Sequence, residues 1–100
     1  MTLPTKAWDA AEYLRQEEDV VAYLNVALED GDPRLLQAAL GDVARARGMT
    51  AVSKRSGLGR ESLYKALKAD ATPSFATVMK VANAVGARLV FQPAVSSTAI

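Results

Sequence analysis

The sequence predicts an all-α protein folded as a single domain, and three observations support this prediction. One hundred residues is close to the usual length of one domain, and half of them are hydrophobic. That content allows a core to form without disulfides or metals. Over most of the chain, apolar residues recur at the i, i+4 and i+7 spacing of helices. Only one short segment near the end is rich in the β-branched and aromatic residues typical of strands.

Residues 8–32 are expected to form two acidic N-terminal helices. In the first, over 8–14, Asp9 is a candidate N-cap and an acid follows three residues later, as in a capping box. The second, over 17–32, has its acids in the first turn, where the helix dipole favours negative charge. Its apolar stripe is wide enough for burial on more than one side, and Gly31 ends it.

Residues 33–86 are expected to form the helical core of the domain. Asp32 followed by Pro33 is typical of a helix start, and Ser74 is a candidate N-cap further along. Glycines and the turn at 70–73 separate the predicted helices, which span 34–48, 49–56, 60–68 and 74–86. Helical periodicity then predicts the buried positions, which are Val20, Leu24, Ala27, Leu28, Leu36, Ala39, Leu40, Val43, Ala44, Met49, Val52, Leu58, Leu63, Leu67, Val78, Val81, Ala82 and Val85.

The C-terminal segment 87–93 contains RLVFQ at 88–92, which reads as a short β-strand. A single strand leaves its backbone groups unpaired, so pairing with the same strand of a second copy is the simplest remedy. This predicts a homodimer whose paired strands contain Leu89, Val90 and Phe91. Alternatively, the segment lies as an extended tail along its own domain. Residues 94–100 are expected to be disordered.

The composition argues against an enzyme. The chain has neither Cys nor His, which removes thiol nucleophiles, imidazole acid–base chemistry, zinc sites and disulfides. It has no glycine-rich phosphate loop, so we expect no cofactor, no metal and no small-molecule substrate. No basic segment followed by an apolar run opens the sequence, and no apolar run approaches the ~18–20 residues of a membrane span. We therefore expect a cytoplasmic protein without membrane contact.

Charge divides the chain into two unequal halves. Residues 1–42 hold three cations and nine acids, a net charge of −6, whereas residues 43–100 hold nine cations and two acids, a net charge of +7. Such a division suggests two surfaces with different partners, and the basic half suits a polyanion. Alternatively, both halves are solvated surfaces that attract each other within one domain.

The basic half contains a break between two short predicted helices, in the stretch SKRSGLGRESLYKALK at 53–68. Gly57 can adopt the positive φ that a steep turn needs, and Leu58 is expected to point into the core. Gly59 stands where a helix N-cap is expected. The break therefore sets the helix over 60–68 at a steep angle to the one before it.

Rotation of the helix over 60–68 at 100° per residue places its leucines inward and its polar side chains outward. An exposed polar helix after a tight turn has the geometry needed to enter a DNA major groove. The candidates for reading bases are Arg60, Glu61, Ser62, Tyr64 and Lys65. The candidates for contacting phosphates are Lys54, Arg55, Lys68, Ser74 and Lys80. The alternative is that this basic helix is only a solvated face.

These residues give the chain a family resemblance. MTAVSKRSGLGRESLYKALKADATPSFATVMKVANAVG, residues 49–86, resembles the helix-turn-helix domain of the lambda-repressor-like (Cro, XRE) family. Residues 8–93 resemble the addiction-module antidote proteins, the HigA-like antitoxins. The resemblance implies a lambda-repressor-like helical core, a dimer on a palindromic operator in its own promoter, and a toxin partner of the RelE/ParE ribonuclease type. The sequence departs from the family pattern at Ala51, Ser53 and Gly59.

Two functions remain open at this point. The first is a DNA-binding antitoxin that represses its own operon and neutralises a toxin, because an acidic surface complements a basic ribonuclease. Candidate toxin contacts are Tyr13, Leu14, Tyr23 and Val26, unless these side chains pack onto their own core. The second is a stand-alone, phage-type transcriptional regulator without a toxin partner, which would use the same DNA-contacting residues.

Overall fold

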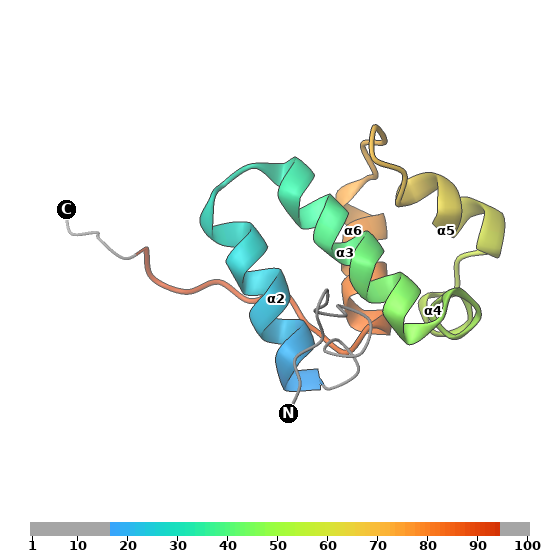
Figure 1. The fold of residues 1–100 in the computed structure, drawn as a ribbon, viewed down its shortest axis with the longest axis horizontal. Helices are drawn as coiled ribbons and strands as arrows, with labels where there is room; N and C mark the ends of the chain where they lie inside the picture. The colour runs from blue at the N-terminus through green and yellow to red at the C-terminus, as the bar shows by residue number, and fades with distance from the viewer. Residues whose placement is uncertain (1–16, 95–100) are drawn as a thin grey trace, which may run out of the picture.

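The computed structural model describes residues 17–94, and in this part of the chain it contains five α-helices (Figure 1). They are α2 Glu17–Glu29, α3 Pro33–Arg47, α4 Met49–Ser56, α5 Arg60–Ala66 and α6 Phe75–Ala84. The predicted all-α class is therefore confirmed for these residues. The helix expected over 8–14 lies outside the described residues. So does the tail expected over 94–100, apart from its first residue. In the described range, no helix has the length and apolar content needed to cross a membrane.

Two predicted N-caps are confirmed. Asp32 precedes α3, which begins at Pro33, and its Oδ1 accepts the Arg34 backbone N–H at 3.0 Å. The Arg34 guanidinium also donates to this carboxylate and holds the pKa of Asp32 below its usual range. Before α6, the Ser74 hydroxyl accepts the Thr77 N–H at 3.1 Å. Each cap satisfies a backbone donor that the first turn of its helix leaves unpaired.

The ends of α2, α5 and α6 come two or three residues earlier than predicted. The end of α6 shows the reason. Gly86 has φ of 95°, and its N–H donates to the carbonyl of Asn83, while the Ala87 N–H reaches back to the carbonyl of Ala82. This is the Schellman arrangement, in which a left-handed glycine lies just outside the helix that it terminates.

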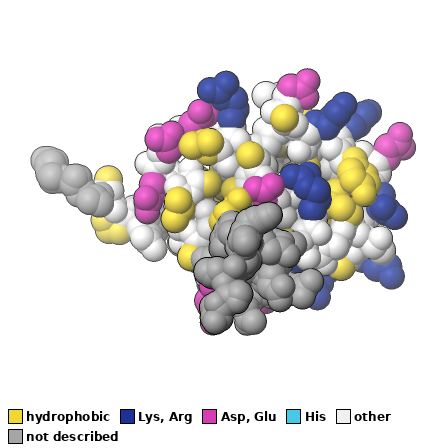
Figure 2. Space-filling view, in the orientation of Figure 1, with side chains coloured by type: hydrophobic (Ala, Val, Ile, Leu, Met, Phe, Trp, Pro, Cys, Tyr) yellow, Lys and Arg dark blue, Asp and Glu magenta, His cyan; other side chains and the backbone are white. Residues whose placement is uncertain are grey.

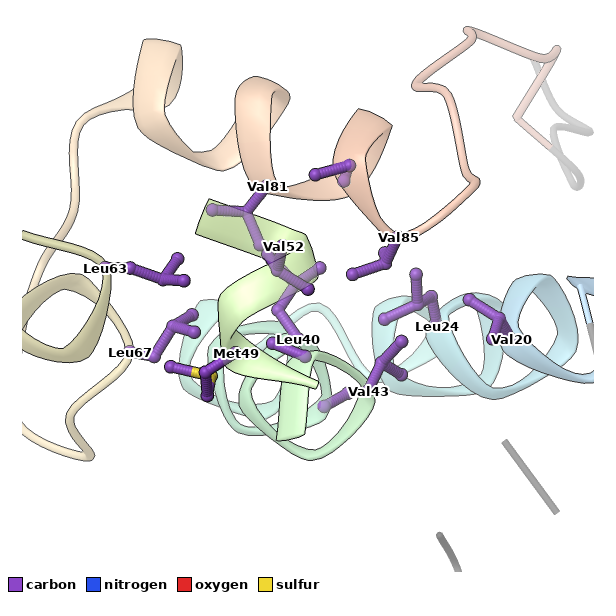
Figure 3. Close-up of a cluster of buried hydrophobic side chains, with 14 residues drawn as sticks. Val20, Leu24, Leu40, Val43, Met49, Val52, Leu63, Leu67, Val81 and Val85 are labelled. Atoms are coloured by element: carbon purple, nitrogen blue, oxygen red, sulfur yellow. The ribbon is translucent and has the colours of Figure 1, made fainter. Parts of the chain in front are cut away.

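One hydrophobic core joins the five helices. α2 packs on α3, α4 packs on α6 and α3, and α5 packs on α4. Figure 3 shows side chains from these helices pointing into a single cluster. The largest fully buried side chains are Leu63, Val20, Val43, Val52, Val81 and Val85. Each such side chain stabilises the fold by about 1.5–3 kcal/mol relative to exposure.

Most predicted core positions are confirmed, and the exceptions lie at the edges. Leu36, Leu58 and Val78 are half-buried and pack against the core cluster. Leu28, predicted to be buried, is instead exposed. It lies in the last turn of α2, which ends at Glu29.

The predicted strand over 88–92 is wrong for the single chain. Residues 87–94 follow α6 without regular secondary structure, and no strand occurs between residues 17 and 94. A strand needs the backbone of a neighbouring strand, and no second extended segment lies beside this one in the described chain. The side chains of Leu89, Val90 and Phe91 remain exposed, Phe91 completely.

Two polar links hold the C-terminal half of α3 in place. The Tyr23 hydroxyl of α2 donates to Asp42 Oδ2 of α3 at 2.6 Å, and this bond, with burial, raises the pKa of Tyr23 to about 12. At the end of α3, Arg47 donates to the carbonyl of Val85 at 3.3 Å and lies 3.6 Å from the Glu17 carboxylate. The acidic α2 therefore contacts α3 through two polar pairs, Tyr23 with Asp42 and Glu17 with Arg47.

Tyr23→Phe is expected to lower the free energy of unfolding by about 1 kcal/mol at neutral pH, because the bond to the Asp42 carboxylate is lost and solvent screens the site only in part. The pKa of this phenol is raised on folding, so its contribution is complete below pH 10 and is lost as the pH rises through about 12. Urea unfolding of both proteins at several pH values should show the difference vanish there. A difference that does not change with pH would contradict this account.

Candidate nucleic-acid interface

The turn between α4 and α5 is built from backbone and hydroxyl contacts. Gly57 has φ of 78°, and its N–H donates to the carbonyl of Ser53 at 3.1 Å. This left-handed conformation strains any residue with a Cβ. Leu58 then packs against the core cluster, as the sequence predicted. The result is a sharp change of direction between two short helices (Figure 1).

Two serine hydroxyls hold the turn together, and the sequence analysis did not predict their hydrogen bonds. The Ser53 hydroxyl donates to the carbonyl of Leu58 at 2.6 Å. The Ser56 hydroxyl accepts the Leu58 N–H at 3.1 Å and donates to the carbonyl of Ser53. The signal was available, because serine hydroxyls readily pair with backbone groups a few residues away. Ser53 therefore adds a hydrogen bond to the turn.

A third missed residue positions the other end of α5. Gln37 of α3 is buried, and its side-chain amide donates to the carbonyl of Lys68 and, at 3.5 Å, to that of Ala66. These carbonyls end α5, where helical partners are missing. The long-range contact joins residues far apart in the sequence, so no local pattern could have revealed it.

α5 presents its polar side chains to solvent. Leu63 and Leu67 are buried, and the five predicted base-reading side chains are all exposed: Arg60, Glu61, Ser62, Tyr64 and Lys65. Two of them contact each other. The Arg60 guanidinium lies over the Tyr64 ring, 5.7 Å from its centre, and donates to the Tyr64 hydroxyl at 3.2 Å. This contact orients the cation at the start of the helix.

The predicted phosphate contacts lie on α4, after α5 and on α6. Lys54 and Arg55 are exposed on α4, Lys68 follows α5, and Lys80 is exposed on α6. None of these four forms an ion pair with an acid within residues 17–94. The Ser74 hydroxyl, in contrast, is already engaged with Thr77. The cations of α4, α5 and α6 are thus available to a polyanion.

The cations of α3 are arranged differently. Arg34 pairs with Asp32 at 3.1 Å, Arg45 with Asp42 at 3.2 Å, and Arg47 with Glu17. In Figure 2 most Lys and Arg side chains lie over the right-hand, α4–α5 side, whereas most Asp and Glu side chains lie over α2 and its connection to α3. No three acids within residues 17–94 come close enough to hold a metal ion.

The candidate toxin contacts divide into three cases. Tyr23 is half-buried, packs against the core and bonds to Asp42, so it serves at least the fold itself. Val26 is 64% exposed on the outer side of α2. Tyr13 and Leu14 lie outside the described residues. An exposed apolar side chain among acids is thus present on α2.

The fold and these surfaces define a small helical protein with an exposed basic helix on one side and an acidic helix on the other. The chain belongs to a known family: residues 4–93 match the family model of probable addiction module antidote proteins. It is 47% identical over 85 residues to an uncharacterised protein of Haemophilus influenzae (strain ATCC 51907 / DSM 11121 / KW20 / Rd), an alignment that covers 85% of this chain and 88% of that relative. No solved structure matches it. An antidote implies a cognate toxin as partner.

The same substitution at two glycines tests the turn. Gly57→Ser should lower the free energy of unfolding by about 1–2 kcal/mol, because serine is strained at its positive φ although space is open there. Gly59→Ser should leave the free energy of unfolding unchanged or raise it by a few tenths of a kcal/mol. Gly59 has φ of −64°, which serine adopts without strain, and the hydroxyl of the introduced serine would cap α5. Thermal and urea unfolding measure both. Equal effects at the two sites would refute the assigned turn geometry.

Proposed function

We propose that the chain is the DNA-binding antitoxin of a toxin–antitoxin module, which represses its own operon and neutralises its toxin. The family supports the antitoxin role. One observation carries the DNA-binding part: the cations on and around α5 are exposed and free of acid partners within residues 17–94, whereas those of α3 are paired. Leaving such charges unpaired is useful where phosphates will neutralise them.

In this proposal α4 and α5 act as a helix-turn-helix, with α5 entering the major groove. Arg60 is well placed for a bidentate contact with guanine, because it lies at the start of the helix that approaches the base edges. Glu61, Ser62, Tyr64 and Lys65 offer acceptors and donors to neighbouring base pairs. The surface reads two half-sites if two copies bind together, which suits a homodimer on a palindromic operator.

Phosphate contacts would hold this helix in register. Lys54 and Arg55 flank it from α4, and Lys68 and Lys80 extend the basic surface beyond its end. Because the Ser74 hydroxyl caps α6, Ser74 would contribute its own backbone N–H rather than its side chain. Binding through such contacts releases counterions, so affinity should fall steeply with salt.

The toxin would bind at the acidic side of the molecule. The exposed acids Glu18, Glu29 and Asp30 surround the outer face of α2, on which Val26 is exposed. A ribonuclease of the RelE/ParE type must attract RNA, so its basic surface complements these acids. α2 and α5 lie on different sides of α3 (Figure 1), so DNA and toxin need not compete for the same surface.

A stand-alone regulator of the phage type is the second candidate. One observation favours it: Tyr23, a candidate toxin contact, is engaged within the fold through its bond to Asp42. In that case the acids of α2 would serve the fold and its solubility. Both candidates place the protein in the cytoplasm, where its DNA is.

Two substitutions separate base reading from phosphate contact. Arg60→Ala should cost about 1–3 kcal/mol of binding to the cognate site and relax base preference at one position. Lys54→Ala should weaken binding to all sequences about equally and reduce the salt slope by about one. Fluorescence anisotropy with promoter DNA at several salt concentrations measures both. Arg34→Ala, which removes a cation already paired with Asp32, is the control and should change little.

A change of sequence preference caused by Lys54→Ala would contradict this assignment of contacts. Loss of binding in the Arg34→Ala control would place the DNA on α3 rather than on α5.

Co-expression with the product of the adjacent small gene tests the toxin partner. The two proteins should elute together in size exclusion, because the acidic α2 attracts a basic partner. Val26→Asp should weaken this complex at least tenfold while leaving DNA binding intact, and Lys54→Ala should do the reverse. Separate elution of the wild-type proteins would favour the stand-alone regulator, and a complex unchanged by Val26→Asp would move the toxin contact away from α2.

A further inference from the structure

A hollow of about 430 Å³ lies between α3, α6 and the connection that joins α5 to α6. Leu36 and Leu40 form its wall on α3, Leu67 lines it at the end of α5, and Phe75 and Val78 line it on α6. None of the side chains assigned above to DNA is among its lining residues. Small-molecule sites are concave, have volumes of roughly 300–1,000 Å³, and are mostly apolar with a few polar groups. The hollow has the size and the walls of such a site.

Gln37 is the buried polar side chain in this wall, and it is only 9% exposed. Its amide nitrogen donates to the carbonyls of Ala66 and Lys68. Its side-chain oxygen accepts no hydrogen bond from residues 17–94, and it is not sealed off from solvent. A nearly buried acceptor without a protein donor is unfavourable unless another molecule supplies the donor. The Gln37 oxygen is therefore a point at which a molecule in the hollow can be held.

Charge around the hollow favours an uncharged occupant. Arg34 is the charged side chain among the lining residues, and its guanidinium is already paired with Asp32 at 3.1 Å. The polar groups beside Gln37 are the carbonyls of Ala66 and Lys68, which are acceptors as well. An anion would meet acceptors instead of an unpaired cation, whereas a neutral donor meets its complement.

We propose that the hollow binds a small, uncharged, apolar molecule with one hydrogen-bond donor, such as an aromatic N–H or an alcohol. The apolar body would displace water from Leu36, Leu67 and Val78, and the donor would bond to the Gln37 oxygen. A molecule of the same shape without the donor would cover that oxygen and leave it unpaired. The site should therefore discriminate between the two.

Such a molecule would also stabilise the end of α5. It would contact Ala66 and Leu67 there, together with Gln37, whose amide already bonds to these last carbonyls. Because the hollow exists only in the folded chain, binding raises the free energy of unfolding by mass action. An effect of the molecule on repression rests on the proposed function, since it requires α5 to read DNA. Binding in the hollow does not.

Titration of the ¹⁵N-labelled full chain with indole, without DNA or toxin, tests the site by nuclear magnetic resonance. Indole is an apolar ring system with one N–H donor, and indene has nearly the same shape without the donor. Indole should bind with a Kd on the order of 0.1 mM and shift amide signals of the lining residues, Gln37, Leu67 and Val78 among them. Indene should bind about fivefold more weakly, because one hydrogen bond is missing.

Three variants assign the binding to the hollow. Ala71→Phe fills it from the α5–α6 connection and should weaken indole binding roughly tenfold. Ala76→Phe makes the same change at an exposed position of α6 outside the hollow, and it should leave indole binding unchanged. Gln37→Met removes the oxygen but keeps the length of the side chain, so it should bind indole and indene equally. Far-UV circular dichroism checks that each variant is folded.

Equal binding of indole and indene by the wild-type protein would overturn the proposal. So would indole binding that Ala71→Phe leaves unchanged, or shifts that spread over exposed apolar side chains without saturating. Signals of the hollow that respond to the toxin and not to indole would assign it to the protein interface instead. If Gln37→Met does not fold, the comparison of Ala71→Phe with Ala76→Phe still decides. No DNA is present in the titration, so its outcome is independent of the tests of DNA binding.

Discussion

Burial of Leu63 is the constraint on which the rest of the functional surface depends. α5 has only seven residues, and a helix that short is not stable in water by itself. It exists because Leu63 and Leu67 are buried against the other helices, as Figure 3 shows, and because the turn and Gln37 hold its two ends. The polar side chains of α5 are then displayed at fixed positions without contributing to the core. The inward side chains of α5 thus serve the fold, and its outward side chains are the candidate functional residues.

The distribution of ion pairs distinguishes the cations of α3 from those of α4, α5 and α6. Each arginine of α3 pairs with an acid: Arg34 with Asp32, Arg45 with Asp42 and Arg47 with Glu17. The cations of α4, α5 and α6 receive no such partners within residues 17–94. Exposed ion pairs contribute little to stability, so pairing or leaving these charges unpaired costs the fold little. The fold therefore leaves these cations free to serve the proposed DNA contact.

Local signals predicted most of the fold. Asp32, Pro33 and Ser74 announced helix starts, and apolar periodicity identified nearly all of the buried residues, because capping and burial are read from neighbours in sequence. The exposed polar face of α5 followed from the same periodicity. Leu28 was misplaced because periodicity identifies the inward face of a helix but not how completely its last turn is covered.

What the sequence did not predict depends on contacts between distant residues or on a missing partner. The bond of Gln37 to the end of α5 joins α3 to a carbonyl some thirty residues later. The segment 88–92 has the composition of a strand, but no other segment of the described chain pairs with it. The sequence also did not predict which arginines form ion pairs. Glu17 reaches Arg47 only because α2 packs on α3.

The most direct test of the central claim is nuclear magnetic resonance of the ¹⁵N-labelled chain titrated with DNA from its own promoter. The account predicts that amide signals of residues 54–68 shift, while those of α2 stay in place. It further predicts that α2 signals shift once the toxin is added to the DNA complex. Shifts on α2 with DNA alone, and none on α5, would contradict the assignment of the basic helix to DNA.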